Sequence, residues 1–194
     1  MEGGFLATLP LVLGMGSNGY DWATDFKEIY QHALREYVQG SRELATLFPA
    51  KATSFLAGIG CSQREVFDFV EDFAREGEPE FEIVLLVTAV RRDFFIVEQG
   101  AKVAFRVIDM ASLPPKSQQL DGIRWLPRII AKAQAKLRGE MPPELMYLCG
   151  GDRPFLRDHG IDAAEFLRRV WAAGDETQKI VNFVKFSKSQ LNKR

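Results

Sequence analysis

The sequence predicts a mostly α-helical protein built from two copies of one small helical unit that pack with pseudo-twofold symmetry. Apolar residues recur at helical spacing, Ser and Asp residues stand where helices would begin, and residues 54–70 resemble residues 154–170. Of the 194 residues, 46% are hydrophobic and 26% are charged, which is typical of a folded globular protein and excludes disordered and low-complexity chains.

The internal repeat is the strongest of these signals. At a shift of 100 positions identical residues lie opposite one another, and upstream residues 26–34 lie over residues 126–134. The identical pairs are Phe55 and Phe155, Leu56 and Leu156, Gly60 and Gly160, Glu65 and Glu165, and Val70 and Val170. Downstream, after a gap of three residues, 83–87 lie over 180–184. Two unrelated amphipathic helices could match by chance, but caps and glycines shared at one offset favour a duplication.

Helix caps define the repeated unit. Ser62 with Glu65, and Asp162 with Glu165, follow the capping-box pattern, in which the first side chain accepts a hydrogen bond from a free N–H at the helix start. A glycine precedes each pattern by two residues, where the end of the preceding helix needs a left-handed residue. Each copy therefore reads as helix, loop, short helix, glycine turn, helix and a further helix.

The apolar periodicity places helices in both copies. In copy one we expect them at 25–38, 52–58, 63–75 and 79–91, and in copy two at 124–137, 152–158, 163–173 and 175–191. The apolar stripe of the first helix in copy two consists of Leu126, Ile129, Ile130, Ala133 and Leu137. Pro127 lies in the opening turn of that helix, where a missing N–H costs nothing, and Gly139 follows its end.

The segment between the copies is less regular. Residues 93–108 contain two runs rich in β-branched and aromatic residues around Gln99-Gly100, which predicts a short β-hairpin, with a continued helix as the alternative. Residues 113–122 contain Pro, Ser and Gly and are expected to form a linker. The chain therefore divides into an N-terminal extension at 1–21, copy one at 22–92, a connector at 93–122 and copy two at 123–194.

The N-terminal apolar run at 5–15 has the length of a signal peptide but lacks its other features. Glu2 is the only charged residue before it, so the positive flank is missing, and Pro10 interrupts a run too short to span a bilayer. Met15 could be the natural start, which would make residues 1–14 an upstream extension. We therefore expect a protein without a membrane segment.

Cysteine content and charge indicate the compartment and limit the partners. Cys61 and Cys149 are the only cysteines and form no CxxC motif, which excludes a disulfide framework and favours the cytoplasm. The formal net charge is −1, so no overall positive field attracts a polyanion. These features argue against both a membrane and a nucleic acid as partner.

A set of motifs around copy two carries a resemblance to a known family. The matching positions are Pro114, Pro115, Ser117, Gly122, Ile123, Leu126, Pro127, Arg128, Lys132, Lys136, Leu137, Gly139, Tyr147, Asp152, Arg153, Gly160, Ile161 and Asp162. Through them, residues 108–187 resemble a bacterial family known as domain of unknown function 5069. The resemblance implies a small, mostly helical bacterial protein and brings no activity with it.

The chain departs from that family pattern in two places. Ala131 stands where the family usually has an acidic residue. Copy one has Pro49, Ala52 and Thr53 where copy two has Cys149, Asp152 and Arg153. A site formed by those family residues would therefore exist only in copy two.

Copy two also holds the candidate ligand-binding residues, which are Arg128, Lys132, Tyr147, Asp152 and Arg153. Cys149 and His159 lie along the same loop and short helix. A charged residue beside a phenol and a thiol could hold a small ligand, with Arg128 as an anion clamp. The structural alternative makes Asp152 a helix cap, Tyr147 an aromatic residue at the edge of the core, and Arg153 a surface group.

The remaining chemistry-bearing residues assemble into neither a catalytic set nor a metal site. His32 and His159 are the only histidines, and no GxSxG motif or Cys-His arrangement accompanies them. The sequence therefore predicts no metal and no cofactor, and it identifies no catalytic residue. It argues against an enzyme without excluding one.

A basic ridge is a further candidate surface. Arg124, Arg128, Lys132 and Lys136 follow one another at a spacing of four residues, with no acidic residue within 124–138. Such a ridge could contact phosphate or nucleic acid, or it could be a solvated helix face whose aliphatic stems cover apolar surface. The nearly neutral chain, without a nucleic-acid-binding motif, favours the solvated face.

These observations favour a non-catalytic helical interaction or binding module. Pairing would give two small copies a larger common core, either as a monomer with an internal pseudo-dimer or as a homodimer. The alternative is a small-ligand-binding protein or enzyme that uses Arg128, Tyr147, Asp152 and Arg153. A second alternative is nucleic-acid or phosphate binding through the basic ridge at 124–138. The expected partner is a protein or a small anionic ligand.

Overall fold

The structure, a computed structural model, describes residues 21–193 and is mostly helical, as the sequence predicts. The helices of the first half are α1 (Trp22–Val38), α2 (Leu44–Leu47), α3 (Ala50–Gly58), α4 (Gln63–Glu76) and α5 (Phe81–Val97). Those of the second half are α6 (Leu126–Arg138), α7 (Asp152–Asp158), α8 (Ala163–Ala173) and α9 (Thr177–Leu191). Each predicted helix is present, α2 is an addition, and α5 extends well past its predicted end.

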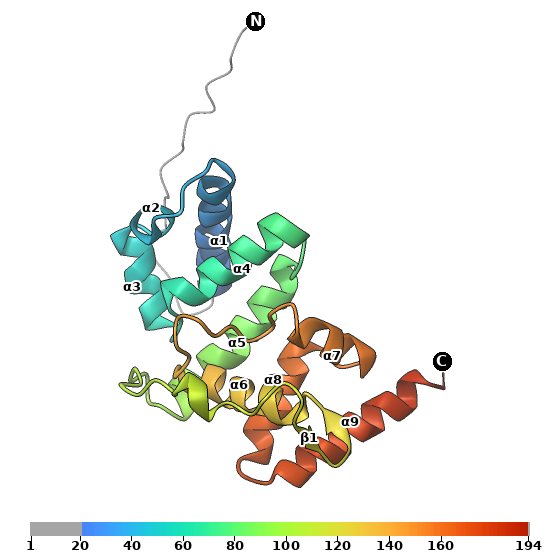
Figure 1. Cartoon of the computed structure of the whole chain (residues 1–194). Helices are drawn as coiled ribbons and strands as arrows, with labels where there is room; N and C mark the ends of the chain where they lie inside the picture. Colours follow the sequence, from blue (N-terminus) through green and yellow to red (C-terminus); the bar gives the residue numbers. More distant parts are fainter. Residues whose placement is uncertain (1–20, 194) are drawn as a thin grey trace, which may run out of the picture.

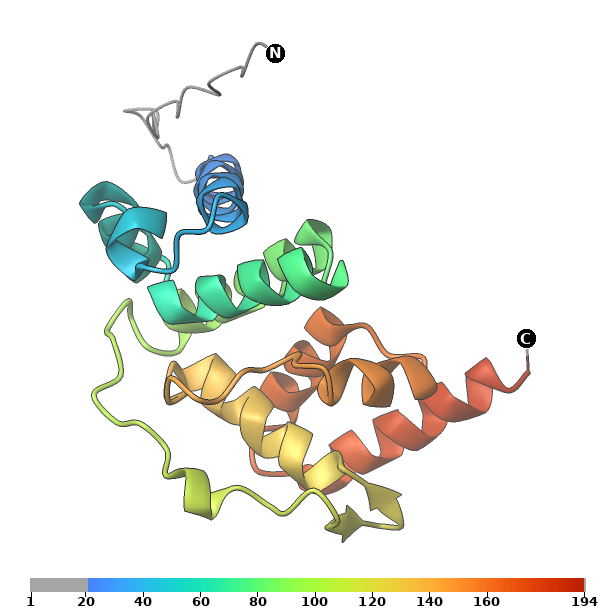
Figure 2. The same ribbon diagram turned by 45° about the horizontal axis from the view of Figure 1, so that its top comes forward.

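The helices form two groups with α5 between them (Figures 1 and 2). In the first group α1 packs against α4, and in the second group α6 packs against α8 and α8 against α9. Helix α5 contacts α1 on one side and both α6 and α8 on the other. It therefore joins the two groups in space as well as along the chain.

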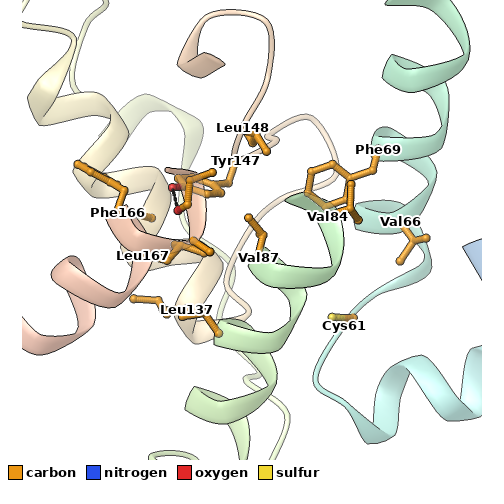
Figure 3. Close-up of a cluster of buried hydrophobic side chains, with 14 of the residues drawn as sticks. Cys61, Val66, Phe69, Val84, Val87, Leu137, Tyr147, Leu148, Phe166 and Leu167 are labelled. Atoms are coloured by element: carbon orange, nitrogen blue, oxygen red, sulfur yellow. Dashed lines mark hydrogen bonds between the residues drawn. The ribbon is translucent and has the colours of Figure 1, made fainter. Parts of the chain in front are cut away.

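One hydrophobic core continues through both groups. The side chains drawn in Figure 3 include Val66 and Phe69 of α4, Val84 and Val87 of α5, and Phe166 and Leu167 of α8. Because α5 buries side chains against both groups, it carries apolar residues over most of its surface rather than along one stripe.

The two glycine turns close with the same hydrogen bonds. Gly60 and Gly160 have φ angles of +74° and +64°, in the left-handed region that favours glycine. The N–H of the residue after each glycine donates to the carbonyl four residues before that glycine, at 2.9 Å in both turns. These bonds satisfy the last carbonyls of α3 and α7, as helix C-caps do.

The predicted capping boxes are confirmed in full at α4 and in part at α8. Ser62 Oγ accepts from the N–H of Glu65 at 3.2 Å, and the Glu65 carboxylate accepts from the N–H of Ser62 at 2.8 Å. Asp162 Oδ1 accepts from the N–H of Glu165 at 3.0 Å. The Glu165 carboxylate pairs with Arg169 at 3.2 Å, one turn further along α8, instead of completing the box.

The β-hairpin predicted at 93–108 is wrong. Residues 93–97 continue α5, with Phe95 buried and Phe94 packed against the core while Ile96 and Val97 are exposed, and 98–108 contain no strand. A two-stranded antiparallel hairpin lies instead in the predicted linker, formed by β1 (Gln119–Leu120) and β2 (Ile123–Arg124). Its turn is Asp121-Gly122, and both residues have positive φ angles, as a tight hairpin turn requires.

The connector between α5 and α6 also contains a 3₁₀ turn (Met110–Ser112) and runs along the outside of the helices (Figure 2). Within residues 21–193, no helix is long and apolar enough to cross a membrane. The predicted N-terminal extension, apart from Asp21, lies outside the described residues.

Candidate functional site

The basic residues between 124 and 138 do not form one exposed ridge, so that expectation is wrong. Lys132 and Lys136 have only 2% and 1% of their surface exposed, whereas Arg124 and Arg138 are exposed. Arg128 donates to the backbone carbonyl of Pro114 at 2.9 Å. The two lysines point into the protein because carboxylates from other helices neutralise them there.

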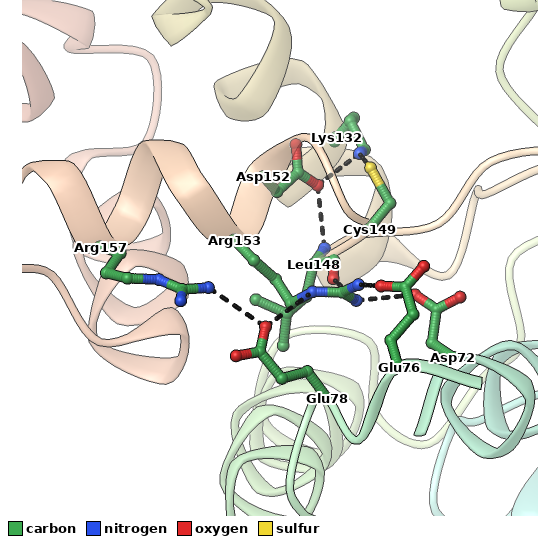
Figure 4. Close-up of polar contacts among 9 residues, drawn as sticks. All are labelled: Asp72, Glu76, Glu78, Lys132, Leu148, Cys149, Asp152, Arg153 and Arg157. Atoms are coloured by element: carbon green, nitrogen blue, oxygen red, sulfur yellow. Dashed lines mark hydrogen bonds and ion pairs between the residues drawn. The ribbon is translucent and has the colours of Figure 1, made fainter. Parts of the chain in front are cut away.

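Lys132 ends in a buried polar cluster with Asp152 and Cys149 (Figure 4). Its ammonium group donates to Asp152 Oδ2 and lies 3.1 Å from Cys149 Sγ. Asp152 is fully buried, and it also accepts from Trp125 Nε1 at 2.9 Å and from the N–H of Leu148 at 2.9 Å. Both oxygens of this carboxylate therefore already have protein partners.

Asp152 is the first residue of α7 rather than its cap, so the expected capping role is wrong. Its two remaining partners, Trp125 and Leu148, both have a φ angle of +72°, which costs a residue other than glycine about 1–3 kcal/mol. Hydrogen bonds to a buried carboxylate help to hold this backbone in place. The arrangement therefore indicates that Asp152 organises the loop around it.

Tyr147 belongs to the core and not to its edge. Only 1% of its surface is exposed, and its hydroxyl donates to the carbonyl of Ala163 at 2.8 Å. Burial, and to a smaller degree the Asp152 and Asp162 carboxylates, raise the pKa of the Tyr147 phenol well above its usual range. The phenol is therefore a neutral structural donor at physiological pH.

Arg153 connects the two groups of helices (Figure 4). It lies on α7, is 7% exposed, and pairs with Asp72 at 2.7 Å and with Glu76, both on α4. Its Nε lies 3.5 Å from the carboxylate of Glu78 in the turn before α5. The expected surface position is therefore wrong, since Arg153 holds three acidic residues from the other half of the chain.

A pocket of about 360 Å³ lies beside Arg153, between the α4–α5 turn and helices α7 and α8. Ile83 and Leu156 contribute apolar wall, while Glu78 and Arg157 pair across it at 3.1 Å. The two cations that line the pocket, Arg153 and Arg157, are thus already paired with carboxylates. Their guanidinium groups therefore have few donors left for an anionic ligand.

The structure therefore brings Lys132, Tyr147, Asp152 and Arg153 into one region, but their polar atoms bond to one another, to the backbone or to carboxylates of the first half. Arg128 binds elsewhere, at the connector. The five predicted ligand-binding residues therefore do not point their polar groups at one common ligand position. Chemically, this cluster keeps its buried charges in fixed ion pairs.

A second buried polar region was not predicted from the sequence. Lys136 pairs with Glu65 at 2.9 Å, which links α6 to α4. Burial opposes ionisation of Glu65, but the Lys136 ammonium and the N–H of Ser62 outweigh it and hold the pKa of this carboxyl below its usual range. The pair therefore stays ionised although it lies inside the protein.

Arg91 of α5 lies next to this pair and is 1% exposed. Its Nη1 donates to Gln99 Oε1 at 2.7 Å and to the carbonyl of Leu137 at 2.9 Å. Its Nε has no hydrogen-bond partner among the described residues. The sequence signal that could have revealed this region is the pair Arg91-Arg92 inside an otherwise apolar run. The signal was missed because the helix was expected to end near Arg91.

Other ligand chemistry has little support in the part of the chain that the structure describes. No three His, Cys, Asp or Glu side chains lie close enough together there to hold a metal ion. In comparisons with known proteins, no family model, curated protein or solved structure matches the chain. The resemblance of residues 108–187 to a bacterial family therefore stays a prediction.

Proposed function

We propose that this protein is a non-catalytic helical interaction module. The polar residues that would serve a ligand site or an enzyme, Tyr147, Asp152 and Arg153, are buried and paired within the protein. Binding of nucleic acid through α6 has less support, because Lys132 and Lys136 are also buried and paired. These contacts favour a structural role for the cluster and support a proposed function on another surface.

The exposed connector is the observation that carries this proposal. Val103, Phe105 and Val107 alternate along it and are 59%, 103% and 56% exposed. Such β-branched and aromatic residues are those that strands prefer. Between residues 103 and 107, no backbone N–H donates to another described residue. A segment with free N–H groups and exposed alternating apolar side chains is suited to pairing with another strand.

The occupant that best fits this segment is a second copy of the chain. Antiparallel pairing centred on Phe105 would place Phe105 opposite Phe105 of the partner subunit, and Val103 opposite Val107 of the partner subunit. All these side chains then lie on one face of the pair, because residues opposite each other in a sheet point the same way. Pairing would cover the apolar surface and give the free N–H groups partners, so we favour a homodimer.

Sedimentation of the full chain tests this proposal. We expect the wild type to be a dimer at about 0.1 mM protein, well above a dissociation constant in the micromolar range. Phe105→Ser should shift it to monomer. Phe186→Ser is the matched control, because Phe186 is also exposed, at 64%, but lies on α9. It should leave the dimer intact.

A monomeric wild type at that concentration would contradict self-pairing. Dimers in both Phe variants would contradict the connector as the contact surface. Recovery of a complex with a different protein, lost only in Phe105→Ser, would replace the second copy by that partner.

We also infer that the two halves arose by duplication and that the protein works in the bacterial cytoplasm. The same helix order, the capped starts of α4 and α8 and the matching hydrogen bonds at Gly60 and Gly160 support a duplication. A pseudo-twofold relation between the halves belongs to the same proposal. The two free cysteines, Cys61 and Cys149, fit a reducing compartment.

A further inference from the structure

A cavity of about 140 Å³ lies where the α3–α4 turn, α5, the end of α6 and the connector meet. Ala57 and Val103 line it with apolar surface, and its polar lining residues are Arg91, Glu65, Ser62 and Cys61. A water molecule takes up about 30 Å³ in the liquid. The cavity therefore admits a molecule of a few heavy atoms and is too small for a nucleotide.

Only one edge of the Arg91 guanidinium group makes hydrogen bonds to described residues. Its Nη1 donates to Gln99 and to Leu137, which fixes the side chain against the end of α6. Its Nε is buried without a partner, and Nη2 donates to no other described residue. The Nε–Nη2 edge is the one that binds two oxygens of a carboxylate or a phosphate side by side.

The charges around the cavity leave Arg91 without a carboxylate of its own. Glu65 is already paired with Lys136 at 2.9 Å and also accepts from the N–H of Ser62. Burial raises the pKa of the Cys61 thiol to about 12, so this group is neutral. A buried cation with free donors is costly, and an anion in the cavity would supply the missing partner.

Gly139 makes room for this position of Arg91. Its φ angle is +68°, and a Cβ atom there would lie 2.5 Å from Arg91 Nη2. A larger residue would therefore have to push the guanidinium group away. Close packing of Gly139 against Arg91 therefore holds both edges of the guanidinium group in place, the edge that is bonded and the edge that is free.

We propose that this cavity is a binding site for a small oxyanion, either a carboxylate or a phosphate, held by the Nε–Nη2 edge of Arg91. The site is separate from the predicted residues of the second half and goes beyond the proposed role of the connector. A ligand there would contact elements from both halves of the chain. It would therefore bind the assembled fold rather than either half.

Nuclear magnetic resonance of the ¹⁵N-labelled full chain tests this site. The side-chain Nε–H signal of Arg91 is identified by its loss in Arg91→Lys. We expect sodium acetate or sodium phosphate to shift this signal saturably, with a dissociation constant in the range of about 1 mM. Sodium chloride at equal ionic strength should shift it much less, because chloride offers one shared acceptor, whereas an oxyanion gives each of the two N–H groups an oxygen of its own. The anion that saturates identifies the ligand as carboxylate or phosphate.

A pair of leucine variants separates binding from folding. Ala57 is exposed and lines the cavity, so Ala57→Leu should reduce the space available to a ligand and weaken anion binding about tenfold or more. Ala50→Leu is the matched control, since Ala50 is exposed on the same helix but does not line the cavity. It should bind as the wild type does.

Two results would overturn the inference. One is an Arg91 signal that neither anion shifts beyond the effect of chloride. The other is anion binding of equal strength in Ala57→Leu and Ala50→Leu. The homodimer is tested at Phe105, so either proposal can fail without the other.

Discussion

At the scale of single residues, the second half of the chain is organised by buried charges. Lys132 and Asp152 are 2% and 0% exposed and form an ion pair, while Arg153 connects α7 to α4. A buried pair of this kind is not in itself a large source of stability, because both charges must leave water. Removing one partner alone is costly, however, since the other charge then stays buried without compensation.

This asymmetry gives a prediction for Lys132. We expect Lys132→Met to lower the free energy of unfolding by about 3–5 kcal/mol, because Asp152 keeps its buried charge. The double variant Lys132→Met with Asp152→Asn should lose less than the sum of the two single variants. Urea unfolding of the four proteins measures this coupling.

An exposed pair provides the control. Lys179 pairs with Glu176 at the start of α9, and both side chains are exposed. Lys179→Met should change the free energy of unfolding by less than roughly 1 kcal/mol. Additive losses at Lys132 and Asp152 would show that the two side chains do not act as a pair.

At the scale of helices and turns, equivalent positions in the two halves have different surroundings. Gly60 and Gly160 end α3 and α7 with nearly the same φ angle. A Cβ atom at Gly60 would lie 2.5 Å from Phe95 Cγ, whereas the nearest atom to one at Gly160, on Leu191, lies at 3.5 Å. Both positions need a residue that tolerates a positive φ angle, but only Gly60 lacks the space for a Cβ atom.

The two glycines therefore form a matched pair for mutation. Both Gly60→Ala and Gly160→Ala should lose about 1–2 kcal/mol from the left-handed backbone. Gly60→Ala should lose about 1–3 kcal/mol more, because Phe95 must move within a packed core. Chemical denaturation measures the difference, and equal losses would contradict the close packing of the α3–α4 turn against α5.

Helix α5 also shows where prediction from the sequence reaches its limit. Its apolar residues were correctly taken as helical up to residue 91, but the following run was expected to form a hairpin, with a continued helix as the alternative. Apolar side chains on every face can belong to a buried strand or to a buried helix. The contact of α5 with both groups of helices decides for the helix.

At the scale of the whole molecule, the two groups behave as one folding unit. The core is continuous, and Arg153 and Lys136 each pair with acidic residues of the other group. We expect thermal unfolding followed by far-ultraviolet circular dichroism and by tryptophan fluorescence to give coincident transitions. Trp22 reports on the first group, and Trp125 and Trp171 on the second. Two separated transitions would contradict a shared core.

The sequence by itself determined the local features of this protein. Most helix positions, the capped starts of α4 and α8 and the two glycine turns depend on residues within a few positions of one another. Periodicity and cap patterns were sufficient to predict them, apart from α2 and the end of α5. The Asp121-Gly122 turn had the same kind of local signal, but it was assigned to the linker.

Only the tertiary structure decided where the charges of the candidate sites lie. Lys136 is paired with a carboxylate 71 residues away and Arg153 with one 81 residues away. Arg91 likewise donates to the carbonyl of Leu137, 46 residues further along the chain. On a helix, a lysine that faces water and one that faces a buried carboxylate share the same local pattern. The free energy that separates them comes from a partner brought close by folding, which the local sequence does not contain.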